Sequence, residues 1–180
     1  CIRDRNEAIN AGEFIYSNLV KKDGGLFHNY VNGQSKINGY LEDYAMVIQA
    51  SLDLYEITLN QLWIERALKL SEYVINNFSS SESELFYFTS KKDEDLISRS
   101  VEFRDNVIPS SNSIMAKNLF RLYHYFDRQE YYDIAKKMCL SVTDEFETYP
   151  SGYTNWFDLI YNLKSNYYEV ALVGENSIDQ

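Results

Sequence analysis

Apolar residues recur three and four positions apart along most of the chain, and this spacing is typical of helices with one buried face. Polar stretches and turn-forming residues interrupt the periodicity at intervals. The pattern predicts six helices, near residues 6–20, 42–58, 61–78, 111–127, 130–147 and 153–164.

Three shorter segments have the character of strands instead. Residues 26–31 are followed by Asn32 and Gly33, a pair that favours a tight hairpin turn. Residues 85–89 are the counterpart of this segment between the third and fourth helices, and residues 170–174 predict a buried strand near the C-terminus. Since that last strand has no partner after it, we expect more chain to have followed.

The chain contains an internal repeat. An offset of 59 residues relates a first set of positions to identical or similar residues: Ala8, Glu13, Phe14, Ile15, Asn18, Leu19, Leu26 and Phe27. An offset of 68 residues does the same for a second set: Leu54, Tyr55, Trp63, Ala67 and Phe78. Fixed-period similarity is the signature of a repeat architecture, and the unit here is a two-helix hairpin with a short extended segment.

The predicted helices are of two kinds. Helices 42–58 and 111–127 are apolar over much of their surface, whereas 6–20, 61–78 and 130–147 have one polar face. This difference predicts two concentric layers, with the apolar helices inside and their starts converging on a cleft. The expected fold is therefore all-α, a partial (α/α)6 toroid of helical hairpins with short β-hairpin segments in its loops.

Composition limits the classes of partner. The chain has 17 Lys and Arg against 27 Asp and Glu, a net charge of −10, so we expect no nucleic acid partner. It has no apolar run of the roughly 20 residues that span a bilayer, which predicts no membrane association and a cytoplasmic location. The length of 180 residues indicates a single domain over 1–180. We expect it to be an internal fragment of the toroid, with 1–5 as a possible non-native scar, since periodicity starts after them.

Aromatic residues are frequent, with 16 Tyr, 10 Phe and 2 Trp. One interpretation is that these rings pack helices together. The alternative is that some tyrosines line a cleft for a polar ligand with a flat face, such as a sugar, because a tyrosine packs its ring and still presents a hydroxyl. Of the two cysteines, Cys139 lies in an apolar helical pattern and is expected to be core.

Two polar segments lie where inner helices are expected to begin. In 39–45, Glu42 and Asp43 either cap the helix or face the cleft as carboxylates that exchange protons or accept hydrogen bonds from sugar hydroxyls. In 104–113, Pro109 and the following small polar residues are a helix-start signal. A single helix cap requires fewer polar groups than this segment contains. Ligand binding is therefore an alternative to capping as the role of these residues.

Three motifs in this order resemble the C-terminal helical part of the thioredoxin-domain-containing family of spermatogenesis-associated protein 20 and its bacterial relatives. They are Leu41-Glu42-Asp43-Tyr44-Ala45, then Leu96-Ile97 with Arg99, then Asp105 through Ser113, within a resemblance that covers about residues 6–174. The chain departs from the family pattern at Asn106 and Ser111, where glycines are usual. That family is similar in turn to the six-hairpin toroids of N-acylglucosamine 2-epimerases and many glycosidases.

The resemblance implies a thioredoxin-like domain upstream in the full-length protein. It indicates candidate site residues, but it does not indicate which reaction they would catalyse. Taken with the residue patterns, the catalytic candidates are Glu42, Asp43 and Asp105. The substrate-binding candidates are Tyr44, His28, Arg99, Arg104, Ser110, Asn112 and Ser113. We expect no metal and no cofactor, because the sequence has no phosphate-binding glycine loop and no histidine cluster.

Two functions remain open at this point. The first is a carbohydrate-related domain that binds or processes a saccharide, glycosidase- or epimerase-like, with two carboxyls drawn from Glu42, Asp43 and Asp105. The second is a non-catalytic binding or scaffold module that accompanies the thioredoxin-like domain. The second predicts a cleft whose capping residues are satisfied and in which no carboxyl pKa is strongly shifted.

Overall fold

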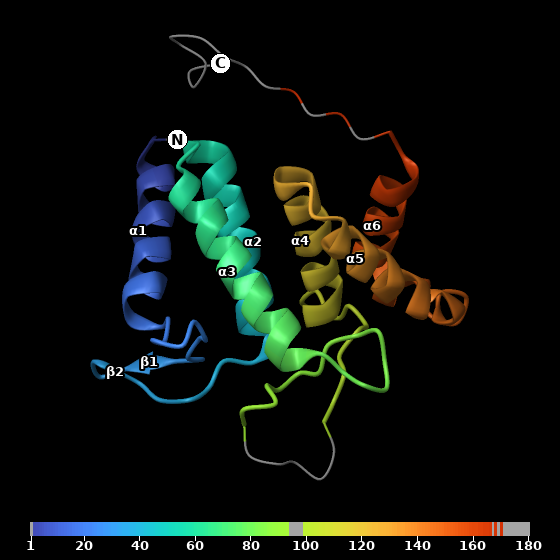
Figure 1. Ribbon diagram of the computed structural model, residues 1–180, viewed down its shortest axis with the longest axis horizontal. Helices are drawn as coiled ribbons and strands as arrows, with labels where there is room; N and C mark the ends of the chain where they lie inside the picture. Colours follow the sequence, from blue (N-terminus) through green and yellow to red (C-terminus); the bar gives the residue numbers. More distant parts are fainter. Residues whose placement is uncertain (1, 94–98, 167, 169, 171–180) are drawn as a thin grey trace.

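The computed structural model describes residues 2–93, 99–166, 168 and 170 (Figure 1). Within these residues, six α-helices are accompanied by one small hairpin and two short 3-10 helices. The α-helices are α1 (Ile2–Asn18), α2 (Leu41–Thr58), α3 (Gln61–Phe78), α4 (Ser111–Phe126), α5 (Gln129–Ser141) and α6 (Thr154–Lys164). The strands are β1 (Tyr30–Val31) and β2 (Gln34–Ser35), and the 3-10 helices are η1 (Thr143–Glu145) and η2 (Pro150–Tyr153).

Two helical hairpins form the centre of the molecule, α2 with α3 and α4 with α5. Each is joined by a two-residue turn whose first residue is left-handed, Leu59 at φ 55° and Asp127 at φ 50°. Each of these residues donates its backbone N–H to a carbonyl four residues earlier, at 2.7 Å in both turns. Leu59 and Asp127 are 68 positions apart, so the repeat seen in the sequence is a repeat of structure.

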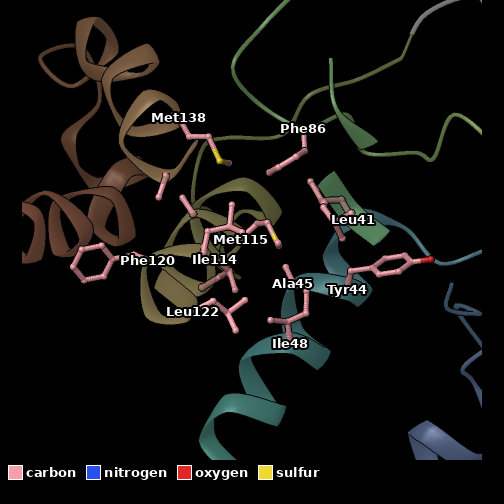
Figure 2. Close-up of a cluster of buried hydrophobic side chains, with 14 of the residues drawn as sticks. Leu41, Tyr44, Ala45, Ile48, Phe86, Ile114, Met115, Phe120, Leu122 and Met138 are labelled. Carbon is pink, nitrogen blue, oxygen red and sulfur yellow. The ribbon is translucent and has the colours of Figure 1, made fainter. Parts of the chain in front are cut away.

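The two hairpins pack through α2 and α4, which are the apolar helices of the sequence pattern. Figure 2 shows Leu41, Ala45 and Ile48 on α2 facing Ile114 and Met115 on α4. A buried polar contact crosses the same interface, from the Asn118 amide to the Ala45 carbonyl at 2.8 Å. α3 and α5 lie on the outer sides of this pair, and α6 packs against α4 and α5. The expected inner and outer layers are thus confirmed.

α1 has no fully buried residue. The contacts that hold it include a hydrogen bond between the hydroxyls of Tyr16 and Ser51 at 2.9 Å, one close approach and one ion pair. A Cβ at Gly12 would lie 2.7 Å from the Trp63 ring, so α1 reaches α3 only because this position lacks a side chain. The Arg66 guanidinium binds both oxygens of Glu13, at 2.7 and 2.9 Å.

The hairpin predicted after the first helix exists, but its strands are short. β1 and β2 are antiparallel, and Asn32 and Gly33 between them both have positive φ, as a type I′ turn requires. The rest of segment 26–31 makes only isolated bridges, such as the one between Phe27 and Asn38. Segment 85–89 likewise makes a single bridge, Ser79 with Phe86. The strand predicted at 170–174 lies outside the described residues, apart from Val170.

Two helix boundaries differ from the prediction by more than two residues. The first helix begins at Ile2, so residues 2–5, expected to lie outside the periodic region, form its first turn. The helix predicted over 130–147 ends at Ser141 and continues as η1. The hydroxyls of Ser141 and Thr143 donate to the carbonyls of Met138 and Leu140. Such local bonds compete with the helical ladder and favour its termination.

None of the helices in the described part of the chain is both long enough and apolar enough to cross a lipid bilayer.

Candidate functional site

A cavity of about 640 Å³ lies where α2 and α4 begin, at the end of the molecule where the long loops gather (Figure 1). Glu42 from the first turn of α2 and Ser110 and Ser111 from the start of α4 line it. Loop residues complete the lining, namely Val101, Glu102, Phe103, Arg104, Asn106, Ile108 and Pro109. The predicted convergence of inner-helix starts on one cleft is therefore confirmed for α2 and α4.

A second cavity of about 300 Å³ adjoins the first, and both are lined by Glu42 and Ile108. Its other lining residues are mostly apolar and come from α1, α2 and the loop between them: Ile15, Leu19, Leu26, Phe27, His28, Asp43, Met46 and Val47. The Glu42 carboxyl group thus belongs to both spaces, which makes it the central acidic group of the site.

Glu102 is the functional candidate that the sequence did not reveal. Desolvation by its surroundings and the negative charge of Glu42 both raise the pKa of the Glu102 carboxyl. Its main chain is fixed by Asn112, whose amide donates to the Glu102 carbonyl at 2.8 Å. In the sequence, Glu102 is visible only as an acidic residue between Val101 and Phe103, just ahead of the 104–113 motif. No rule of residue spacing predicts that this loop residue lies near the start of α2.

Asp43 is occupied by local hydrogen bonds. One of its carboxylate oxygens accepts the Tyr40 N–H at 2.8 Å, which caps the start of α2. The two oxygens also lie 2.9 and 3.1 Å from Nδ1 of His28, whose ring packs edge-on against Tyr40. The sequence grouped His28 and Asp43 as site residues, and the structure does bring them together.

His28, Glu42 and Asp43 each offer one ligand atom within 4.8 Å of the others, a spacing at which they could hold a metal ion. The three groups come from the loop after α1 and from the first turn of α2, so neighbouring segments create the cluster. The expectation of no metal stays a prediction.

Asp105 is buried, and its oxygens face helix starts. One oxygen accepts the Ser110 N–H at 2.9 Å and the Ser113 hydroxyl at 2.8 Å. The other accepts the Asn155 N–H at 2.9 Å and the Thr154 hydroxyl at 3.5 Å. This carboxylate joins the starts of α4 and α6, and it is not part of the described lining of either cavity.

Asn112 and Ser113 also act on the protein itself. The Asn112 side chain accepts the Phe86 N–H at 2.8 Å and donates to the Phe86 carbonyl at 3.0 Å, so it fixes the preceding loop against α4. Ser113 is fully buried and bonds to Asp105. Ser110 caps α4 by accepting the Ser113 N–H at 3.1 Å, and of these three residues it alone lines the cavity.

The two predicted arginines differ in their position. Arg104 lines the cavity, is about half exposed, and bonds to Tyr153 at 3.0 Å and to Glu145. Arg99 donates to the Thr89 carbonyl and lies over the Tyr87 ring at 4.2 Å. Arg99 therefore supports the loop, and the Leu96-Ile97 motif that accompanies it lies outside the described residues.

No tyrosine is among the lining residues of either cavity in the described chain, which favours the interpretation that the tyrosine rings pack helices together. Tyr44 shows the reason: its ring stacks on Tyr73 at 5.4 Å and its hydroxyl accepts the Leu26 N–H at 2.7 Å. Burial strongly raises the pKa of this hydroxyl. In Figure 2 the Tyr44 side chain points away from the core shared by α2 and α4.

Fold and site together define part of a helical toroid whose cavity lies at the starts of its inner helices. The structure is similar to the crystal structure of a D-mannose isomerase, with a TM-score of 0.60 over 82% of this chain and 36% of that chain. Their sequences are 16% identical, a level at which the likeness concerns the fold alone.

The sequence relatives confirm the family resemblance. The chain is 35% identical to spermatogenesis-associated protein 20 of Mus musculus over 111 residues, and 36% identical to that of Homo sapiens over 104 residues. Each match covers 57% of this chain and 13% of the relative. An uncharacterized protein of Caenorhabditis elegans is 30% identical over 118 residues, 66% of this chain and 16% of its own. The chain thus spans a small part of these relatives, and no protein-family model matches it.

Proposed function

We propose that this chain binds a saccharide in the cavity at the starts of α2 and α4, and that Glu42 and Glu102 exchange protons with it. The observation that carries the proposal is the pair itself. Glu42 and Glu102 line one cavity, and burial together with the charge of Glu42 raises the pKa of Glu102. Carboxyls whose environments separate their pKa values are suited to complementary acid and base roles.

The raised pKa of Glu102 supports different roles for the two carboxyl groups. Glu102 retains its proton to higher pH than an ordinary glutamate, so it is the proton donor to a sugar oxygen. Glu42, in the first turn of α2, lies where the helix dipole favours a negative charge, so it is the acceptor. This pair replaces the one predicted among Glu42, Asp43 and Asp105, because the oxygens of Asp43 and Asp105 are engaged at helix starts.

The likeness to a D-mannose isomerase supports a carbohydrate-related function by analogy of fold, which is an associational argument. On the family resemblance we also propose an upstream thioredoxin-like domain. The cytoplasmic location expected from the hydropathy of the sequence is likewise part of the proposal. In this proposal residues 1–180 are a single domain that forms one part of the ring.

A saccharide array followed by thermal-shift titration tests the function. At least one sugar should raise the melting temperature of the chain, and Glu42→Gln and Glu102→Gln should each abolish the shift. Glu65→Gln, an exposed glutamate on α3, is the matched control and should bind as the unaltered chain does. The proposal fails when no sugar stabilises the chain, or when both cavity variants respond like the control.

A non-catalytic binding module is the second candidate, and one observation favours it. Asp43 and Asp105 are satisfied as capping groups, as that alternative predicts. The first candidate rests instead on the raised pKa of Glu102, which burial and the charge of Glu42 cause. NMR spectra of each bound sugar over time separate the two, because an enzyme converts its ligand and a binding module leaves the ligand spectrum unchanged.

A further inference from the structure

The Asn112 side chain, at the start of α4, holds two separate stretches of the loop that joins α3 to α4. Its oxygen accepts the Phe86 N–H at 2.8 Å, and its nitrogen donates to the carbonyls of Phe86 and Glu102, at 3.0 and 2.8 Å. An amide side chain has two N–H donors and one carbonyl oxygen, so its bonding capacity is used within the protein. Asn112 is fully buried and is not among the described lining residues of either cavity, so it does not contact a ligand there.

The same two stretches of loop are hydrogen-bonded to each other and to the start of α2. The Phe88 N–H donates to the Ser100 carbonyl at 2.8 Å, and the Phe88 carbonyl accepts the Leu41 N–H at 2.9 Å. The rings of Tyr40 and Phe88 also stack, with their centroids 4.9 Å apart. Residues 86–88 therefore connect the stretch that carries Glu102 to the helix start that carries Glu42.

A carboxyl group on a loop needs such support to act together with a second one. The backbone of a loop lacks the regular hydrogen bonds of a helix, and its position is less restricted. The interaction between two charges weakens with distance and with the amount of water between them. The influence of Glu42 on Glu102 therefore requires a fixed main chain at Glu102, and the Asn112 amide binds that main chain directly.

We propose that Asn112 is a positioning residue, whose amide holds the main chain of Glu102 so that the Glu42 and Glu102 carboxyl groups face one saccharide. This inference rests on the proposed function and gives Asn112 a role through Glu102 in place of direct substrate binding. Proton transfer requires groups held to within about 0.5 Å by residues that are themselves locked in place. The buried Asn112 side chain, bonded to Phe86 as well as to Glu102, meets this requirement.

Carbon NMR titration of the Glu102 carboxyl group in an Asn112→Ala chain tests the positioning role. The pKa of Glu102 should fall toward 4.5, because the released loop gives the carboxyl more contact with water and more distance from Glu42. Adding Glu42→Gln should then change this pKa by about half as much as it does in the unaltered chain, or less.

Asn118→Ala is the matched control for the loss of a buried amide. Asn118 is on the same helix, is equally buried, and donates to the Ala45 carbonyl at 2.8 Å without lining either cavity. This variant should also melt at a lower temperature, because a buried hydrogen bond is lost, but it should keep the Glu102 pKa and its response to Glu42→Gln. Equal changes of the Glu102 pKa in both variants would show that Asn112 is merely structural, and an unchanged pKa in Asn112→Ala overturns the positioning role.

The unaltered chain provides a second measurement, which decides the matter where Asn112→Ala does not fold. Since the Asn112 amide is bonded to the Glu102 carbonyl, its side-chain NMR signals should shift with pH at the midpoint of the Glu102 carboxyl. Signals that do not follow this titration overturn the proposal. Neither measurement requires a sugar, so a negative saccharide array overturns the proposed function while the link between Asn112 and Glu102 is judged separately.

Discussion

Asp105 receives hydrogen bonds from the backbones of two helices at once. We expect Asp105→Asn to lower the free energy of unfolding by about 2–4 kcal/mol, because the amide would turn an NH₂ group toward N–H donors that then lack an acceptor. Urea denaturation followed by circular dichroism measures the loss. Asp144→Asn, at an exposed position of η1, should change stability by less than about 0.5 kcal/mol. Equal stability of the two variants would contradict the bracing role.

Glu102 makes stability depend on pH. Its carboxyl pKa is raised in the folded state, so the folded chain holds a proton that the unfolded chain has already released. Stability is therefore fully present below the ordinary glutamate value of 4.5, and it falls as the pH rises through the folded pKa. Glu102→Gln should match the unaltered chain in melting temperature near pH 4 and exceed it at pH 7.

The charge of Glu42 is the second cause of the raised pKa of Glu102, after burial. A variant that removes this charge is therefore a control for the pH dependence. In a Glu42→Gln chain the pKa of Glu102, followed by carbon NMR of its carboxyl group, should move back toward 4.5. An unchanged titration curve in that variant would show that burial alone raises the pKa of Glu102.

At the scale of helices, Gly12 sets how closely α1 approaches α3. Gly12→Ala should destabilise the chain by about 1–3 kcal/mol, because the new Cβ meets the buried Trp63 ring and the Leu54 side chain. This loss is net of the roughly 1 kcal/mol by which alanine favours a helix over glycine. Thermal melts compared with Asn10→Ala, an exposed position of α1, provide the check. A Gly12→Ala chain as stable as that control would refute the close packing.

The helices were predictable because their periodicity is local. α2, α3 and α4 agree with the sequence to within one residue at each end, and the 68-residue offset located two matching turns. Glu42 was identified at a helix start for the same reason. Glu102 was not identified from the sequence. It lies in a loop that reaches the start of α2, and the periodicity of apolar residues does not predict the course of a loop. Capping and ligand binding use the same residue types, so only hydrogen-bond partners distinguished Asp105 from Glu42.

For the molecule as a whole, Cys139 reports on the integrity of the fold. Burial raises the pKa of its thiol to about 11, so at pH 8 the reactive thiolate is scarce and inaccessible. In a Cys1→Ser chain, a thiol reagent such as dithionitrobenzoate should label Cys139 at least about 100-fold more slowly than in guanidinium chloride, where the chain is unfolded. Native labelling at the rate of a free thiol would show that α5 opens without global unfolding.

The two ends of the helical hairpins are built differently. At one end the turns at Leu59 and Asp127 are as short as a helical hairpin permits. At the other end long loops join successive hairpins, and the segment 79–110 is longer than its counterpart 19–40. That extra length lies in the segment that contributes Glu102 and Arg104 to the cavity. Insertions and deletions in the loops can therefore change the lining of the cavity, while the helical scaffold keeps its sequence constraints.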